Sequence, residues 1–197
     1  MKSEKNENNK EWKILKPIGY KIDNQEEFDK TIRIKDYSKK GKPFPGKSEN
    51  TFMNLLRQLN SLKKVSKLWI NSGIEYDAVI SLRPDLRYLD KLDISVIYNS
   101  MKNKNILYKP NWQRHYGLND RFAVGSPQSI SIYSSRIYSS KFFFNNINGN
   151  SELLLLYYCY MKKLKNRDLI IRALRIRPGN IIYGFDMKFF GLKGKNL

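Results

Sequence analysis

Residues 76–86 read YDAVISLRPDL, a mainly apolar run that ends in Arg83-Pro84-Asp85. Positions 78–82 are apolar on both faces of an extended chain, which is typical of a central strand covered on both sides. Proline has no N–H to donate, so Pro84 ends the pairing and places Asp85 at the carboxyl end of the strand. Ligands bind at that edge in open α/β sheets. The stretch therefore predicts a site for a metal ion and a phosphate, with an ordinary turn carrying a surface aspartate as the alternative.

Helical and extended patterns alternate on either side of this strand. Apolar residues recur at helical spacing from position 52 to 69, and Ser48 or Asn50 can cap that helix. Ser126-Pro127 is typical of an N-cap followed by proline at the first helical position. The predicted helices span residues 50–69, 126–137 and 151–164, and the predicted strands span residues 76–82, 105–109, 121–125 and 169–176. This alternation predicts the α/β class, a single-domain mixed sheet flanked by helices.

The last predicted helix, residues 151–164, is almost wholly apolar. Its predicted buried face consists of Leu153, Leu156, Tyr157, Tyr160 and Leu164.

Length and composition are those of a folded domain. The 197 residues suffice for one domain with a core, and we expect residues 1–11 to be a disordered polar tail and residues 12–197 to form the domain. No stretch approaches the roughly 20 apolar residues of a membrane span, and the N-terminus has no apolar signal core. Cys159 is the only cysteine, so an internal disulfide is excluded and a buried thiol is predicted. These features favour the cytoplasm.

The chain is strongly basic, with 37 Lys and Arg against 18 Asp and Glu and a formal net charge of +19. Clustered basic residues would indicate a nucleic-acid-binding module, because they neutralise phosphates and release counterions. Here the lysines are spread along the chain, and no zinc-finger spacing, RNP-like strand or basic zipper accompanies them. The charge favours anionic partners in general, and the nucleic-acid module remains the alternative from a different class.

Four further residues are candidates for chemistry. Asp120 and Arg121 lie at the start of the predicted strand 121–125, and an ordinary turn explains them equally well. Glu152 stands in the first turn of a helix, where a carboxylate also complements the helix dipole. Arg177 ends the final strand and faces either a phosphate or solvent.

Motifs of several enzyme classes are absent. The sequence contains no P-loop and no G-x-G-x-x-G, and its single histidine, His115, argues against a zinc site. The remaining chemistry compatible with acidic strand ends is transfer from a diphosphate leaving group, assisted by Mg²⁺ or Mn²⁺ on carboxylate oxygens.

Six segments in this order resemble a known family: NTFMNLLRQLNSLKKVSKL (50–68), YDAVISLRPDL (76–86), NILYKP (105–110), GLNDRFAVGSPQSISIYSSRI (117–137), SELLLLYYCYMKKL (151–164) and LRIRP (174–178). The chain is similar over about residues 12–180 to glycosyltransferase-like proteins of large DNA viruses, phages and bacteria, which are of the GT-A type. RPDL followed by NDRFAVGS carries most of this resemblance.

The resemblance implies a GT-A-like fold and transfer of a hexose from a nucleotide-diphospho-sugar to a glycan or another hydroxyl acceptor. It places Asp85 at the divalent cation, Mn²⁺ or Mg²⁺, with Arg83 beside the diphosphate. It places Asp120 and Arg121 near the transferred sugar, with Asp120 as a catalytic carboxylate. Glu152 would be a second catalytic residue on the acceptor side, and Arg177 would lie near the diphosphate. If the chain is viral, the implied location is the host cytoplasm.

Two departures from the family pattern bear on activity. Arg-Pro-Asp offers one carboxylate where a full Asp-x-Asp offers two. About seventy residues precede Tyr76, fewer than the strand-helix-strand unit that forms the base-binding half of the pocket in such proteins. The resemblance therefore implies a member that lacks part of the N-terminal nucleotide-binding unit, and an inactive remnant of the fold is a further alternative.

Overall fold

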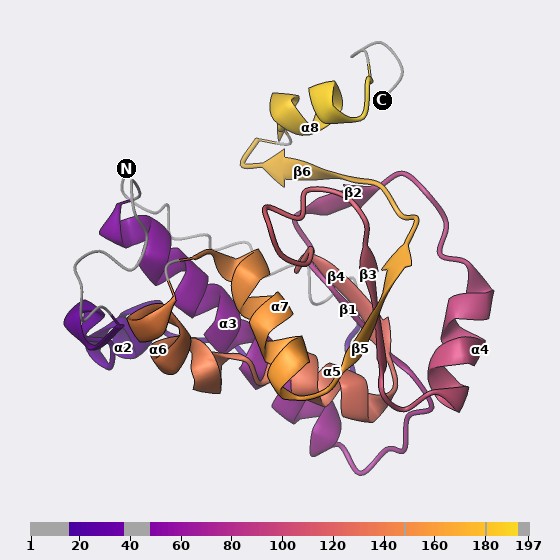
Figure 1. The fold of residues 1–197 in the computed structure, drawn as a ribbon, viewed down its shortest axis with the longest axis horizontal. Helices are drawn as coiled ribbons and strands as arrows, with labels where there is room; N and C mark the ends of the chain where they lie inside the picture. The colour runs from indigo at the N-terminus through magenta and orange to yellow at the C-terminus, as the bar shows by residue number, and fades with distance from the viewer. Residues whose placement is uncertain (1–15, 38–47, 148, 180, 193–197) are drawn as a thin grey trace.

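The computed structural model describes residues 16–37, 48–147, 149–179 and 181–192 (Figure 1). The predicted tail, residues 1–11, lies outside these ranges. The helices are α2 (Gln25–Lys30), α3 (Glu49–Ile70), α4 (Ile94–Lys102), α5 (Pro127–Ser134), α6 (Ile137–Asn146), α7 (Ser151–Met161) and α8 (Gly184–Phe189), with a 3₁₀ turn η1 at Ile34–Tyr37. The strands are β1 (Val79–Leu82), β2 (Leu86–Tyr88), β3 (Ile106–Pro110), β4 (Phe122–Gly125), β5 (Lys165–Leu169), β6 (Ala173–Arg177) and β7 (Ile181–Ile182).

The larger sheet is mixed, in the order β1-β4-β3-β5. β4 pairs antiparallel with both β1 and β3, whereas β3 and β5 run parallel. The parallel pair is reached through α5, α6 and α7, as expected because parallel neighbours need a crossover. The predicted α/β class with a mixed sheet flanked by helices is confirmed.

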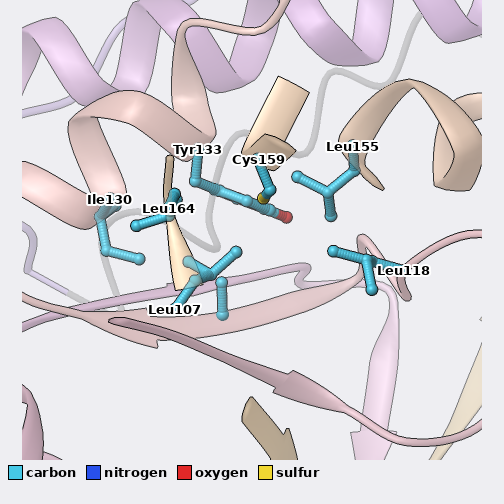
Figure 2. Packing of buried hydrophobic residues seen from close by; sticks show 8 residues of the cluster. Leu107, Leu118, Ile130, Tyr133, Leu155, Cys159 and Leu164 are labelled. Carbon is cyan, nitrogen blue, oxygen red and sulfur yellow. The ribbon is translucent and has the colours of Figure 1, made fainter. Parts of the chain in front are cut away.

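Each face of this sheet carries its own core. On one face Leu107 and Ala123 pack against Ile130 and Tyr133 of α5 and Leu155 of α7 (Figure 2). The other face is covered by α4, which Figure 1 shows across the sheet from α3 and α7. Its core members are Val96, Phe122, Val124, Leu169 and Ile171. Because both faces of β4 are covered, all four of its residues are buried.

A smaller antiparallel sheet has the strand order β2-β6-β7. It lies above the larger sheet in the view of Figure 1, with α8 next to β6. Asp186 of α8 is fully buried and accepts hydrogen bonds from Gln113 Nε2 at 2.8 Å and from Arg175 Nε at 2.9 Å. The backbone N–H of Ile176 donates to the carbonyl of Asp85 at 2.9 Å. The small sheet therefore fixes the segment that follows β1.

The prediction of a central strand at residues 78–82 is wrong. Among the described residues β1 pairs with β4 alone, so it is an edge strand. Ile80 and Leu82 are 40% and 55% exposed. An apolar run indicates that a strand is covered but not by what, and here part of it lines a pocket instead of a core.

The strand predicted over residues 169–176 is confirmed only from Ala173, where β6 begins in the small sheet, because Leu169 still belongs to β5 of the larger sheet. Arg172 makes the turn between them, where its backbone N–H donates to Asp90 Oδ2 at 2.6 Å. The helix predicted over residues 126–137 likewise ends at Ser134, and α6 begins at Ile137.

Helix α7 begins after Asn150, as predicted, but of its predicted buried face only Leu164 is buried, while Leu153 and Tyr157 are half-buried. The side chains that are buried belong to Glu152, Leu154, Leu155, Tyr158 and Cys159. Leu156 and Tyr160 are instead 37% and 79% exposed. A helix that is apolar all round carries no period from which its orientation can be determined. Cys159 is buried as predicted, and burial raises the pKa of its thiol to about 11.

No helix in the described ranges combines the length and apolarity needed to cross a membrane.

Candidate functional site

A pocket of about 720 Å³ lies beside the edge strand β1, between α3 and α5. Its wall is largely apolar, and its charged residues come from the two sequence motifs that were singled out. The apolar wall includes Leu62, Val65, Trp69, Val79, Leu82 and Ile130, and the polar lining includes Gln58, Arg83, Asp85, Asp120 and Arg121. We call this cavity the β1 pocket. The strand end and the start of β4 thus meet at one cavity.

Helix α3 divides its apolar stripe between the core and this pocket. Phe52, Leu56 and Leu59 in the first three turns are at most 1% exposed and pack on α6 and α7. Farther along, Val65 is 54% exposed and lines the β1 pocket with Trp69. The regular spacing predicts the helix, but it does not distinguish a core stripe from a pocket wall.

Arg83 and Asp85 form a closed pair at the end of β1. Arg83 Nε donates to Asp85 Oδ1 at 2.8 Å, and Nη2 donates to Oδ2 at 2.6 Å. Burial disfavours ionisation of Asp85, but hydrogen bonds from Arg83 and its charge, with a smaller effect of Arg177, outweigh burial and lower the pKa of the carboxyl. Both carboxylate oxygens are therefore occupied by one guanidinium.

Three neighbouring side chains hold Asp120 in place. Arg136, whose side chain is fully buried, brings Nη2 to within 3.4 Å of Asp120 Oδ2 and donates through Nη1 to the carbonyl of Tyr133. Gln58 Nε2 reaches the same carboxylate oxygen at 3.5 Å. The Tyr133 hydroxyl donates to the Asp120 carbonyl at 2.6 Å. Asp120 is thus fixed by its backbone and by two long side-chain contacts.

Arg121 is buried without a hydrogen bond to its guanidinium in the part of the chain that the structure describes. Its side chain is 9% exposed, its Nη1 has no partner, and Glu152 Oε1 lies 3.8 Å from its Nη2. The guanidinium lies over the ring of Trp112, 5.6 Å from the centroid. Burial is the main cause that lowers the pKa of Arg121, against the opposing charges of Asp120 and Glu152.

A second pocket, of about 490 Å³, shares Asn54, Gln58 and Arg121 with the first. We call it the α7 pocket, because the N-terminus of α7 forms one of its sides with Ser151 and Glu152. Residues added by other segments are Thr51, His115, Arg175, Tyr183 and Phe185. The two cavities therefore adjoin at Arg121.

Glu152 is more than a helix-terminal charge. The α7 N-terminus is capped by Asn150, whose Oδ1 accepts from the N–H of Leu153 at 2.8 Å. The Glu152 side chain is buried, and burial, together with the nearby charge of Asp120, raises the pKa of its carboxyl. Gly117 makes this placement possible, because a Cβ there would lie 2.1 Å from the Glu152 carbonyl carbon. The loop before β4 therefore packs directly against the backbone of Glu152.

Arg177 lines neither of these two pockets. It lies at the end of β6, exposed, with its guanidinium 5.1 Å from the ring centroid of Tyr183. Its charge is nevertheless one of the causes that lower the pKa of Asp85. Tyr116, in the loop before Asp120, is 94% exposed and lines neither pocket.

The donor set at Asp85 does not fit a divalent cation held by the protein alone. Both oxygens of Asp85 accept hydrogen bonds from Arg83, and the positive guanidinium beside them disfavours a cation at the same carboxylate. Within the described ranges no three His, Cys, Asp or Glu side chains are grouped so that they could hold a metal ion. The predicted Mn²⁺ or Mg²⁺ remains a prediction, and no step below is routed through a metal.

Sequence reasoning missed Gln58 and Arg136. Gln58 joins the two motifs, because its Oε1 accepts from Arg83 Nη1 at 3.4 Å while its Nε2 faces Asp120. It lies on α3, where a glutamine among leucines gives no signal. Arg136 could have been noticed as a lone charge between two apolar helical segments, which marks a buried charge that needs a partner.

Searches against protein-family models, curated proteins and solved structures find no match to this chain.

Proposed function

We propose that the protein is a glycosyltransferase of GT-A-like fold that binds a nucleotide-diphospho-sugar in the β1 pocket and a hydroxyl acceptor in the α7 pocket. The observation that carries the proposal is the convergence of the two motifs. Asp85 and Asp120, 35 positions apart, line the same cavity, and that cavity adjoins a second one at Arg121. Two adjoining pockets with charged groups between them suit a reaction that joins two substrates.

The two ends of the β1 pocket suit the two parts of a donor. The apolar wall around Val65, Trp69 and Val79 offers a surface for a nucleoside. The end that carries Arg83 and Arg121 offers guanidinium donors, which bind phosphate oxygens with charge-assisted hydrogen bonds. The transferred sugar would then lie at the junction of the pockets, beside Asp120.

The α7 pocket suits a sugar acceptor. Tyr183 and Phe185 supply aromatic surface, and Ser151 and Asn54 supply polar groups. Glu152 is the base in this proposal: the acceptor oxygen attacks the anomeric carbon, its proton passes to the Glu152 carboxylate, and the nucleoside diphosphate leaves with the electrons of the broken bond. A carboxyl whose pKa is raised is better matched to that proton transfer than an ordinary one.

Calorimetry with a panel of nucleotide sugars, with and without Mn²⁺, tests binding, and release of the nucleoside diphosphate in the presence of glycan acceptors tests turnover. We expect one donor to bind, and Asp120→Asn to lower turnover by about 100-fold or more. The matched control is Asp36→Asn, because Asp36 pairs with Arg33 and Lys141 and lines neither pocket.

Three other outcomes separate the alternatives. Binding without turnover under any acceptor would favour the inactive remnant. Absence of binding to every nucleotide sugar would contradict the proposal. Affinity for DNA or RNA that falls steeply with salt, with no donor bound, would favour the nucleic-acid module.

A further inference from the structure

We propose that Arg83 and Arg121 together take the place of a divalent cation, so that the protein binds the diphosphate of its donor without a metal. This inference rests on the proposed function and names how the same site handles the donor's negative charge. It is carried by the state of the two guanidinium groups in the β1 pocket.

The first observation is the unsatisfied hydrogen-bonding capacity of Arg121. Its Nη1 is buried and has no hydrogen-bond partner among the described residues, and its side chain is 9% exposed. A buried guanidinium that lacks hydrogen bonds is costly, and here the Trp112 ring and the distant Glu152 carboxylate replace its lost hydration only in part. A ligand oxygen at Nη1 would remove that cost, so the arrangement favours an anionic ligand at this point.

The neighbouring carboxylates compensate part of the charge of Arg121 but give it no hydrogen bond within the described ranges. Glu152 Oε1 lies 3.8 Å from Nη2, beyond hydrogen-bond range. Asp120 directs Oδ2 toward Arg136 and Gln58. Arg121 therefore keeps its capacity to bind an anion.

The second observation is the arrangement of Arg83. Asp85 occupies Nε and Nη2 of this guanidinium, which leaves Nη1 in a long contact of 3.4 Å with Gln58 Oε1. Asp85 therefore acts as a positioning residue that orients Arg83, and the remaining donor of Arg83 is available to a ligand. In this geometry the cationic group, and not the carboxylate, meets the diphosphate.

The two arginines act on the same space. Both line the β1 pocket, and the charge of Arg83 is one of the causes that lower the pKa of Arg121. The charge of Asp120 acts favourably on both and offsets part of their mutual repulsion, and a bound anion would offset more of it. Both guanidiniums are good partners for phosphate, so they can hold the phosphate oxygens that a divalent cation would otherwise hold.

Calorimetry with UDP, GDP, ADP and CDP as probes tests this inference, first in EDTA and then with added Mn²⁺. We expect at least one of these diphosphates to bind in EDTA, and Mn²⁺ to change its affinity by less than about threefold. Arg121→Gln and Arg83→Gln should each weaken binding in EDTA by about tenfold or more, the loss of one charge-assisted contact. Arg87→Gln is the matched control, because Arg87 is exposed on β2 and lines neither pocket.

The remaining outcomes are distinguishable. Binding that requires Mn²⁺ would overturn the inference and leave the proposed function standing, as would binding in EDTA that neither glutamine variant weakens. Absence of binding to all four diphosphates with and without Mn²⁺ would overturn both. Thermal unfolding of each variant checks that a lost affinity reflects the site, and Arg121→Lys, which keeps the charge but not the planar donors, should bind more weakly than wild type and more tightly than Arg121→Gln.

Discussion

The β1 pocket contains two pairs of an aspartate and an arginine that are close in sequence, and they differ in almost every physical respect. Arg83 and Asp85 are about one-third exposed and satisfy each other through two short hydrogen bonds. Asp120 and Arg121 are buried and do not satisfy each other. Asp120 is held by Arg136 and Gln58, whereas the Arg121 guanidinium lacks a hydrogen bond within the described ranges.

An arginine and an aspartate that are close in sequence can therefore hydrogen-bond to each other, as Arg83 and Asp85 do, or can point to different partners, as Asp120 and Arg121 do. A satisfied pair near the surface contributes little to stability and can be held ready for a ligand. A buried and unsatisfied charge costs stability, so its presence indicates a role outside folding. The strand-end motif drew attention to the site, but the charge that calls for a ligand lies at the start of β4.

The largest effect on stability is expected when Arg136, which holds Asp120, is replaced. Arg136→Met leaves the Asp120 carboxylate buried without its nearest cation, and we expect the free energy of unfolding to fall by about 3–5 kcal/mol. Urea denaturation measures this. Arg114→Met is the matched control, because Arg114 pairs with Asp168 while 45% exposed and should cost at most about 1 kcal/mol. Equal losses in the two variants would contradict the distinction between the pairs.

The next effect concerns the pH dependence of stability. Because the pKa of Glu152 is raised above its ordinary 4.5, the folded protein binds its proton more tightly than the unfolded chain does. The contribution of this group to stability therefore falls as the pH rises from 4.5 through the folded-state pKa, with a slope of up to about 1.4 kcal/mol per pH unit.

Glu152→Gln should remove this slope, so that the variant gains on wild type as the pH rises through that window. Denaturation midpoints measured at a series of pH values test this. A wild-type contribution that instead grows with pH, as it does for a carboxyl with a lowered pKa such as Asp186, would contradict the assignment.

A smaller effect of the opposite sign is expected at Arg121. Arg121→Met removes a buried charge that lacks a hydrogen bond, so we expect the free energy of unfolding to rise by about 1 kcal/mol while diphosphate binding is lost. Thermal and urea unfolding of the free protein measure the gain. A loss of stability of that size would indicate that Arg121 supports the fold. It would contradict the claim that its charge, unlike that of Arg83, costs stability in the free protein.

The smallest effect on stability is expected at the satisfied pair. Asp85→Ala should change the free energy of unfolding by about 0.5 kcal/mol, as for other partly exposed ion pairs, while diphosphate affinity falls by about tenfold because Arg83 is no longer oriented. Chemical denaturation and calorimetry on the same preparation separate the two readouts. A stability loss of several kcal/mol would favour a purely structural strand end.

The sequence predicted what depends on local chemistry. Ser126-Pro127 and Asn150 mark helix starts through a side-chain oxygen and a missing N–H, and both helices begin there. Pro84 ended β1 for the same kind of reason, and Asp85 lies at the strand end as expected. The family resemblance, and not the local pattern, implied one site for Asp85 and Asp120, and both line the β1 pocket.

What the sequence did not predict depends on distant neighbours. Among the described strands β1 pairs only with β4, which lies some forty residues farther along, and this pairing places β1 at the edge. The face that α7 buries cannot be determined from a helix that is apolar all round. That the Arg121 guanidinium has no hydrogen bond among the described residues depends on the segments that surround it in the fold, and the sequence near Arg121 does not indicate it.

The most direct test of the account is a crystal structure of the protein with a nucleoside diphosphate bound. We expect the base to lie against the apolar wall at Val65 and Trp69, and a phosphate oxygen to lie within about 3 Å of Arg121 Nη1 and of Arg83 Nη1. A diphosphate bound elsewhere, or bound in this pocket with Arg121 Nη1 still lacking a partner, would contradict it.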